Sequence, residues 1–158
     1  MVRIALDTNV MAYAEGVGDT KRCRAARNLV ARLPGHLVVI PAQTLGELHR
    51  VLVGKAGKAP AEARAAILSW ADAFDVADST FDALRAALDL AADHQTPIWD
   101  ALILSVAADQ KCRLLLSEDF QHGFTWEVLP CSIRSRRRSM HCWSRCSSKL
   151  DIPWKPLS

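Results

Sequence analysis

Short apolar segments separated by longer segments of helical periodicity predict an α/β fold with a mainly parallel central sheet flanked by helices. The apolar segments are residues 2–6, 37–40 and 113–116, which we interpret as buried strands. Strands that alternate with helices are joined by right-handed crossovers, and ligands bind beyond the carboxyl ends of such strands. We therefore expect a functional site where these segments end.

The connections between the strands are predicted from helical spacing and from turn residues. Helices are expected over residues 21–33, 41–53, 61–74, from 81 onward and from 97 onward, with a short strand at 74–77. Residues 54–60, GKAGKAP, form a loop by composition. Glu47 lies inside the second helix, about two turns from its start.

The last two helices carry expectations about caps and buried faces. Ser79 or Thr80 is expected to cap the first, and Thr96 the second, with Pro97 at its first helical position. Spacing predicts that these apolar residues point inward: Phe81, Leu84, Leu88 and Ala91, then Trp99, Leu102, Ile103 and Val106. Asp100 falls in the first turn, where amide ends favour a negative charge.

Length and composition favour one soluble domain with one site. The chain has 158 residues, of which 50% are hydrophobic, enough for one proper core. No segment approaches the roughly 20 apolar residues that a membrane span needs, and the N-terminus lacks the pattern of a signal peptide, so we expect a cytoplasmic protein. Five scattered cysteines do not form a secreted disulfide framework, and reduced thiols are expected.

The charge divides the chain near residue 126. Residues 1–126 carry 13 Lys and Arg against 15 Asp and Glu, whereas residues 127–158 carry 7 against 2. We interpret residues 1–126 as the domain and residues 127–158 as an atypical basic tail, rich in Cys, Arg and Trp, that is disordered or altered in reading frame. A basic RNA-binding arm is the alternative, because flexible arginines bind phosphates without a fold.

Four carboxylates stand where a strand has just ended or within a helix near that edge: Asp7, Glu47, Asp100 and Asp119. Acidic side chains that converge repel one another and are costly to bury, so a divalent cation bound through oxygens is their usual reason to gather. Taken singly, each has an ordinary explanation as a cap, a turn residue or a surface charge. Together they indicate a metal-dependent phosphodiester enzyme.

Four segments in this order resemble PIN-domain ribonucleases, most closely the VapC-type toxins of type II toxin–antitoxin systems. The segments are ALDTNVMAYAE, PAQTLGELHRVL, TPIWDALILSVAADQKC and LLLSEDFQHG, which together cover residues 2 to 123. The resemblance implies a PIN-like three-layer α/β fold. It makes residues 1–126 a PIN-like nuclease domain.

The resemblance also implies roles for individual residues. Asp7, Glu47, Asp100 and Asp119 would form the acidic centre, with Asp7, Asp100 and Asp119 as the metal ligands. Thr8, Asn9 and Ser117 would not bind the metal themselves but would orient these groups or a metal-bound water. Glu118 is the rival to Asp119, and the Ser-x-Asp register that begins at Ser117 favours Asp119.

The activity that the resemblance implies is Mg²⁺-dependent cleavage of RNA, with Mn²⁺ as a substitute and a 5′-phosphate and 3′-hydroxyl as products. Glu47 would bind a second ion, orient the attacking water or accept its proton, and these roles stay open. The implied partners are the RNA substrate, a cognate antitoxin that silences the pocket and a second copy of the chain in a homodimer.

Two other functions remain in view. The first is a PIN-like protein that binds metal and RNA with little or no turnover, because the altered C-terminus has spoiled the sheet. The second is phosphotransfer with Asp7 as the acceptor, which is weakened because Asn9 stands where haloacid-dehalogenase-like enzymes have a second Asp. A basic cluster at Lys21, Arg22, Arg24 and Arg27 is either a phosphate contact or a solvated helix face.

Overall fold

The structure is a computed structural model that describes residues 2–117 and 125–128. Its described strands form one sheet in the order β3-β2-β1-β4-β5. The strands are β1 (Arg3–Leu6), β2 (Val38–Pro41), β3 (Asp75–Ala77), β4 (Cys112–Ser117) and β5 (Thr125–Val128). The pairs β1–β2, β1–β4 and β2–β3 are parallel, and only β4–β5 is antiparallel among these. The predicted mainly parallel α/β sheet is confirmed.

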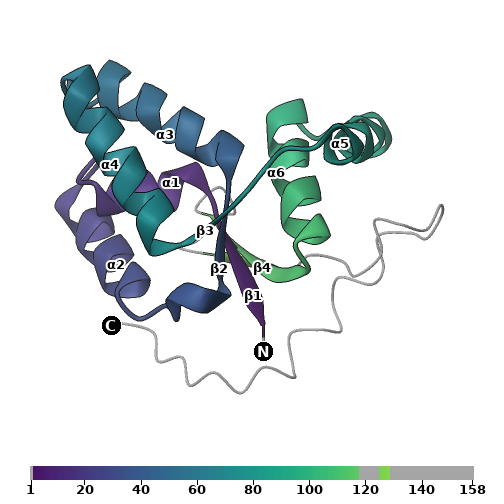
Figure 1. The fold of residues 1–158 in the computed structure, drawn as a ribbon, viewed down its shortest axis with the longest axis horizontal. Coiled ribbons are helices and arrows are strands. Elements are labelled where there is room, and N and C mark those ends of the chain that lie inside the picture. The colour runs from purple at the N-terminus through teal and green to yellow at the C-terminus, as the bar shows by residue number, and fades with distance from the viewer. Residues whose placement is uncertain (1, 118–124, 129–158) are drawn as a thin grey trace.

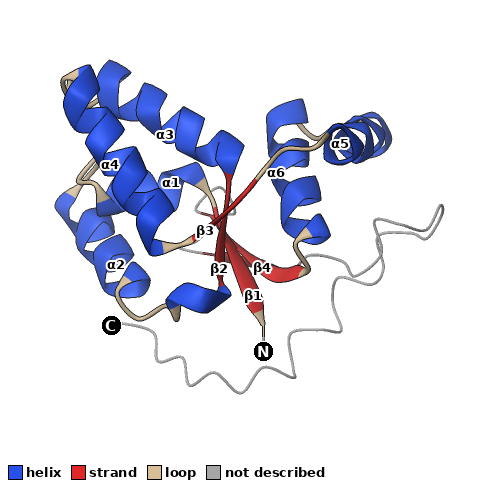
Figure 2. Cartoon of the chain, viewed as in Figure 1, coloured by secondary structure: helices blue, strands red, loops and turns tan. Residues whose placement is uncertain are grey.

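Six α-helices and one short 3-10 turn connect the described strands. The helices are α1 (Thr8–Ala14), α2 (Thr20–Val30), α3 (Ala42–Gly54), α4 (Pro60–Ala73), α5 (Phe81–His94) and α6 (Ile98–Asp109), and the turn is η1 (Gly35–Leu37). Figure 1 shows α1 to α4 on one side of the sheet and α5 and α6 on the other. The strands lie between these two groups of helices (Figure 2). This is the expected three-layer arrangement.

The three layers follow from the two-residue alternation of the central strands. Ile4 and Leu6 of β1 belong to the core beneath α1, α3 and α4, whereas Ala5 between them belongs to the core beneath α5 and α6. In β2, Ile40 and Val39 divide between the same two cores. A strand with apolar residues on both faces can be buried only between two helical layers.

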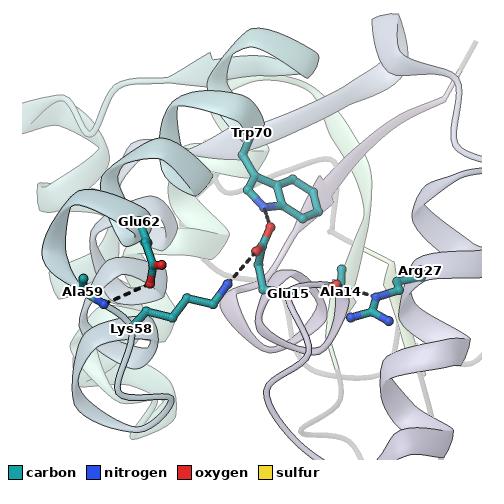
Figure 3. A network of polar contacts seen from close by, with 7 residues as sticks. All are labelled: Ala14, Glu15, Arg27, Lys58, Ala59, Glu62 and Trp70. Carbon is teal, nitrogen blue, oxygen red and sulfur yellow. Dashed lines mark hydrogen bonds and ion pairs between the residues drawn. The ribbon is translucent and has the colours of Figure 1, made fainter.

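A polar network joins the far end of α1 to α4 and to the loop before it (Figure 3). Trp70 Nε1 donates a 2.9 Å hydrogen bond to Glu15 Oε1, and Lys58 Nζ lies 3.2 Å from Glu15 Oε2. On the α2 side, Arg27 Nε donates to the carbonyl of Ala14 at 2.8 Å. These contacts hold the C-terminal end of α1 from both sides.

The buried faces of α5 and the start of α6 differ from those expected. Phe81 and Leu88 are 75% and 53% exposed, and the buried residues of α5 are Ala83 and Ala87. Trp99 was expected to point inward and is 60% exposed, whereas Leu102, Ile103 and Val106 are buried as predicted. The small alanine side chains allow α5 to approach α6 closely, which turns the larger residues of α5 outward.

The start of α6 also differs by one residue from the prediction. Pro97 is the N-cap rather than the first helical residue, and no side chain caps this end, so Thr96 does not cap the helix. Thr80 caps α5 as expected by accepting a hydrogen bond from the Ala83 amide. No helix in the described residues is long and apolar enough to cross a membrane.

The predicted boundary at residue 126 falls inside β5, whose four residues pair with β4. The rest of the tail, 129–158, lies outside the described residues, as do Glu118, Asp119 and His122. The hypothesis of a basic RNA-binding arm therefore stays a prediction.

Candidate active site

Asp7 stands at the carboxyl end of β1 and is the N-cap of α1, with φ −87° and ψ 159°. Its Oδ1 accepts a 2.7 Å hydrogen bond from the Thr8 amide, and its Oδ2 accepts a 2.6 Å hydrogen bond from Ser117 Oγ. Its own amide donates to the carbonyl of Leu116 in β4 at 3.0 Å. Asp7 is thus fixed where the two central parallel strands end together.

Glu47 approaches the same place from the second turn of α3. Its Oε2 accepts a 2.9 Å hydrogen bond from Thr8 Oγ1, and its Oε1 accepts a 3.0 Å hydrogen bond from Gln43 Nε2. Both donors are neutral groups. They orient the Glu47 carboxylate without neutralising its charge, so it remains available to a cation or to a proton.

The N-terminus of α6 reaches the same edge of the sheet. The helix ends beside the amino end of β4, so its start lies toward the carboxyl end of that strand. Gln43 Nε2 also donates to the carbonyl of Trp99 at 3.3 Å, which ties the first turn of α6 to α3. Asp100, the next residue, therefore stands in an exposed first turn beside the elements that hold Asp7 and Glu47.

The structure thus links most of the predicted site residues. Hydrogen bonds join Ser117 to Asp7 and Thr8 to Glu47, and the backbone next to Asp100 joins this set through Gln43. Asn9 is half-buried in the first turn of α1, next to Thr8. Asp119 and its rival Glu118 lie outside the described residues.

Gln43 is a site residue that sequence reasoning missed. A glutamine four residues before a glutamate faces the same side of a helix, but such pairs are common on helix surfaces. The Oε1 atom of Gln43 is buried and has no hydrogen-bond donor among the described residues. A buried acceptor left unpaired costs about 1–3 kcal/mol.

The basic cluster of α2 is largely engaged in local contacts. Arg22 pairs with Asp19 at 3.4 Å and stands 5.8 Å from the centre of the Tyr13 ring, and Arg27 supports the end of α1. The amide of Arg22 donates to Asp19, and this hydrogen bond holds the pKa of Asp19 below its usual value. His49 is exposed and lines a shallow apolar hollow between α3 and α4.

The chemistry of the donor set fits a hard divalent cation. The groups at this edge are carboxylate and hydroxyl oxygens, and hard oxygen atoms are the ligands that Mg²⁺ prefers. In the described part of the chain no three His, Cys, Asp or Glu side chains gather closely enough to hold an ion by themselves. Asp119 is not in that part.

Comparison with known protein families identifies the family of this chain. The sequence profile of the PIN domain matches residues 4–123. This chain belongs to the PIN domain family. The match covers β2, β3, β4 and all but the first residue of β1, and it includes the four predicted carboxylates. A search of curated proteins finds no match.

Solved structures of this fold include several PIN-domain toxins. The toxin VapC20 of Mycobacterium tuberculosis, described as cleaving the sarcin–ricin loop, is 25% identical with a TM-score of 0.64, and the match covers 80% of this chain and 99% of VapC20. A toxin–antitoxin complex from Klebsiella pneumoniae is 18% identical with a TM-score of 0.58, covering 75% and 88%. VapBC2 from Rickettsia felis, bound to promoter DNA, is 16% identical with a TM-score of 0.55, covering 77% and 90%. The last two show likeness of fold.

Proposed function

We propose that this PIN-domain protein is a Mg²⁺-dependent endoribonuclease toxin that a cognate antitoxin neutralises. The observation that carries the proposal is the set of hydrogen bonds that fixes Asp7, from the end of β1, and Glu47, from α3, at one edge of the sheet. VapC20, which is similar over nearly its whole length, is described as a toxin that cleaves the sarcin–ricin loop. The geometry of the site and this likeness both support the proposal.

Each carboxylate has a proposed role. Asp7 and Asp100, together with Asp119, hold the cation, and Ser117 orients Asp7 through its hydroxyl. Mg²⁺ bound there supplies an activated water and offsets the charge that develops on the phosphate. Glu47, held by Thr8 and Gln43, orients the attacking water, accepts its proton or binds a second ion.

The substrate and the partners follow from the same proposal. RNA is the proposed substrate, because carboxylates that hold a cation suit hydrolysis of a phosphodiester and because VapC20 is described as cleaving the sarcin–ricin loop. An antitoxin is the proposed inhibitor, and solved complexes of the same fold include toxin–antitoxin pairs. We also propose a homodimer in the cytoplasm, which light scattering of the purified protein would test.

The experiment is cleavage of a panel of structured RNAs by the purified protein with Mg²⁺, Mn²⁺ or EDTA. Asp7→Asn and Asp100→Asn should each reduce cleavage by about 100-fold or more, since loss of a ligand should exceed the loss of its supporting partners. Asp109→Asn is the matched control, because Asp109 is an exposed aspartate at the other end of α6. Cleavage that survives EDTA or either site variant would sink the metal–carboxylate mechanism.

A protein that binds metal and RNA without turnover would give a different result. Mn²⁺ and RNA would bind with the dependence on Asp7 that the site predicts, but no product would form on any RNA of the panel. Direct binding measurements beside the cleavage assay therefore separate the two functions.

A further inference from the structure

Gln43 joins two elements that carry proposed site residues. Its side-chain amide has two hydrogens, one directed at Glu47 Oε1 at 3.0 Å and one at the carbonyl of Trp99 at 3.3 Å. Because both partners can only accept, the nitrogen must face them and the oxygen must face away. A flipped amide would set its oxygen against the Glu47 carboxylate. The orientation of Gln43 is therefore fixed by its surroundings.

The position of Gln43 sets the relation between α3 and α6. Gln43 and Glu47 lie one helical turn apart on the same face of α3, so the side-chain amide of Gln43 can hold the Glu47 carboxylate in place. The same nitrogen holds the backbone of α6 next to Asp100. One side chain thus couples the two helices from which Glu47 and Asp100 project.

The oxygen of the Gln43 side chain takes no part in these two hydrogen bonds. Oε1 is shielded from solvent and finds no donor among the described residues. Buried polar groups in proteins are almost always paired. A water molecule does not reach this oxygen, so among the described residues it is the nitrogen of Gln43 that contacts Glu47 and the first turn of α6.

We propose that Gln43 is a positioning residue of the acidic site, whose Nε2 braces Glu47 and the first turn of α6 in one arrangement. A neutral donor of this kind orients the Glu47 carboxylate toward a cation without adding charge. The inference rests on the proposed function, since it requires the cation.

The test is Mn²⁺ binding to the full chain without RNA, followed by electron paramagnetic resonance. Gln43→Met keeps the length of the side chain and removes both the donor and the acceptor. We expect its dissociation constant for Mn²⁺ to rise about 10-fold or more, the range found for groups that support metal ligands. Thr44→Val is the matched control, because Thr44 is fully buried in the same turn of α3 and its hydroxyl donates to the Pro41 carbonyl instead.

A second readout is taken on the unmodified protein. The side-chain NH₂ resonances of Gln43, assigned by their absence in Gln43→Met, should shift when Mg²⁺ is added to the unmodified protein. Steady-state cleavage should show kcat reduced about 10- to 100-fold in Gln43→Met, with KM for RNA changed less than about 3-fold. A loss that comes only from weakened folding would lower the active fraction and leave the Mn²⁺ affinity of the folded molecules unchanged.

The outcomes separate this inference from the proposed function. If the unmodified protein binds Mn²⁺ and Gln43→Met binds it equally well, or if the Gln43 resonances do not respond to Mg²⁺, the inference about Gln43 is wrong and the nuclease proposal stands. If the unmodified protein neither binds Mn²⁺ nor cleaves RNA, both fall together. If affinity falls in Gln43→Met and not in Thr44→Val, the inference is supported.

Discussion

Thr8 Oγ1 donates a 2.9 Å hydrogen bond to Glu47 Oε2, although the two residues are 39 positions apart in the chain. Thr8 is the first residue of α1 and directly follows Asp7, while Glu47 belongs to α3. The contact therefore sets Glu47 in a fixed relation to Asp7. This hydroxyl therefore links α1, which follows β1, to α3, which follows β2.

Thr8→Val tests that relation. Valine has nearly the shape of threonine and no hydroxyl, so Glu47 loses one of its two hydrogen-bond donors among the described residues, while the packing of this 7% exposed side chain is kept. We expect cleavage to fall about 10-fold or more and stability to fall by about 1–2 kcal/mol. Thr8→Ser restores the donor and should retain most of the activity. Equal activity of the valine and serine variants would refute the role of the hydroxyl.

Ser117→Ala tests the support of Asp7 from β4. Ser117 is 3% exposed, and its Oγ donates to Asp7 Oδ2 at 2.6 Å. Loss of this donor should reduce cleavage about 10- to 100-fold. Ser105→Ala is the paired comparison, because Ser105 is equally buried in α6 but its hydroxyl has no hydrogen-bond partner among the described residues.

Ser105→Ala should not reduce stability, in contrast to the loss of a hydroxyl that is hydrogen-bonded. Removal of an unpaired buried hydroxyl should be neutral or stabilise by up to about 1 kcal/mol, which corresponds to a Tm higher by about 2–4 °C. Its cleavage rate should match that of the unmodified protein. A Tm that drops in Ser105→Ala, measured by calorimetry, would show that the hydroxyl is paired in solution.

The layout of the sheet and the position of the site could be predicted from sequence because both depend on local patterns. The apolar runs at β1, β2 and β4 and the polar residues that follow them mark strand ends, and parallel strands bring their carboxyl ends to one edge. That is enough to place Asp7 and Ser117 together. It also places Glu47 in the helix after β2.

The remaining features depend on tertiary packing that a single sequence does not encode locally. Helical periodicity predicts a stripe, but alanines can form the buried side when helices pack closely, as Ala83 and Ala87 do while Phe81 is 75% exposed. Trp99, at the start of α6, is likewise exposed although the spacing predicted that it points inward. Gln43 was missed because a glutamine has no chemical signature until its partners are known.

Trp70→Phe tests the polar network at the far end of α1. Phenylalanine can keep the stacking on Phe74, whose ring centre lies 5.6 Å away, but it loses the indole donor to Glu15. We expect a loss of about 1–3 kcal/mol in the free energy of unfolding and unchanged activity per folded molecule, because Asp7 is at the opposite end of α1. Urea unfolding and active-site titration measure the two quantities.

Lys58→Met is the control for that variant. Lys58 reaches the same carboxylate, but its ion pair with Glu15 is 31% and 24% exposed on the two sides. A pair that water reaches should contribute less than about 1 kcal/mol. A larger loss in Lys58→Met than in Trp70→Phe would show that the ion pair, rather than the indole hydrogen bond, holds α1 against α4.

Cys112 should make the fold sensitive to alkaline pH. Burial disfavours the thiolate and raises the pKa of Cys112 from 9.0 to about 11. Below pH 9 the thiol is neutral in both states, and between about pH 9 and 11 the unfolded chain deprotonates first, so stability is lost as the pH rises. Cys112→Ala should show a smaller fall in Tm over this window. Parallel pH profiles for the two proteins would contradict the assignment.

The central claim is that Asp7, Glu47 and Asp100 belong to one cation site at the carboxyl edge of the sheet. The most direct measurement is anomalous diffraction from crystals of the protein grown with Mn²⁺. We expect a Mn²⁺ peak in contact with the Asp7 carboxylate, at a metal–oxygen distance near the roughly 2.0–2.6 Å of hard divalent cations, and no such peak in Asp7→Asn crystals. Well-ordered carboxylates with no peak between them, or a peak elsewhere on the protein alone, would contradict it.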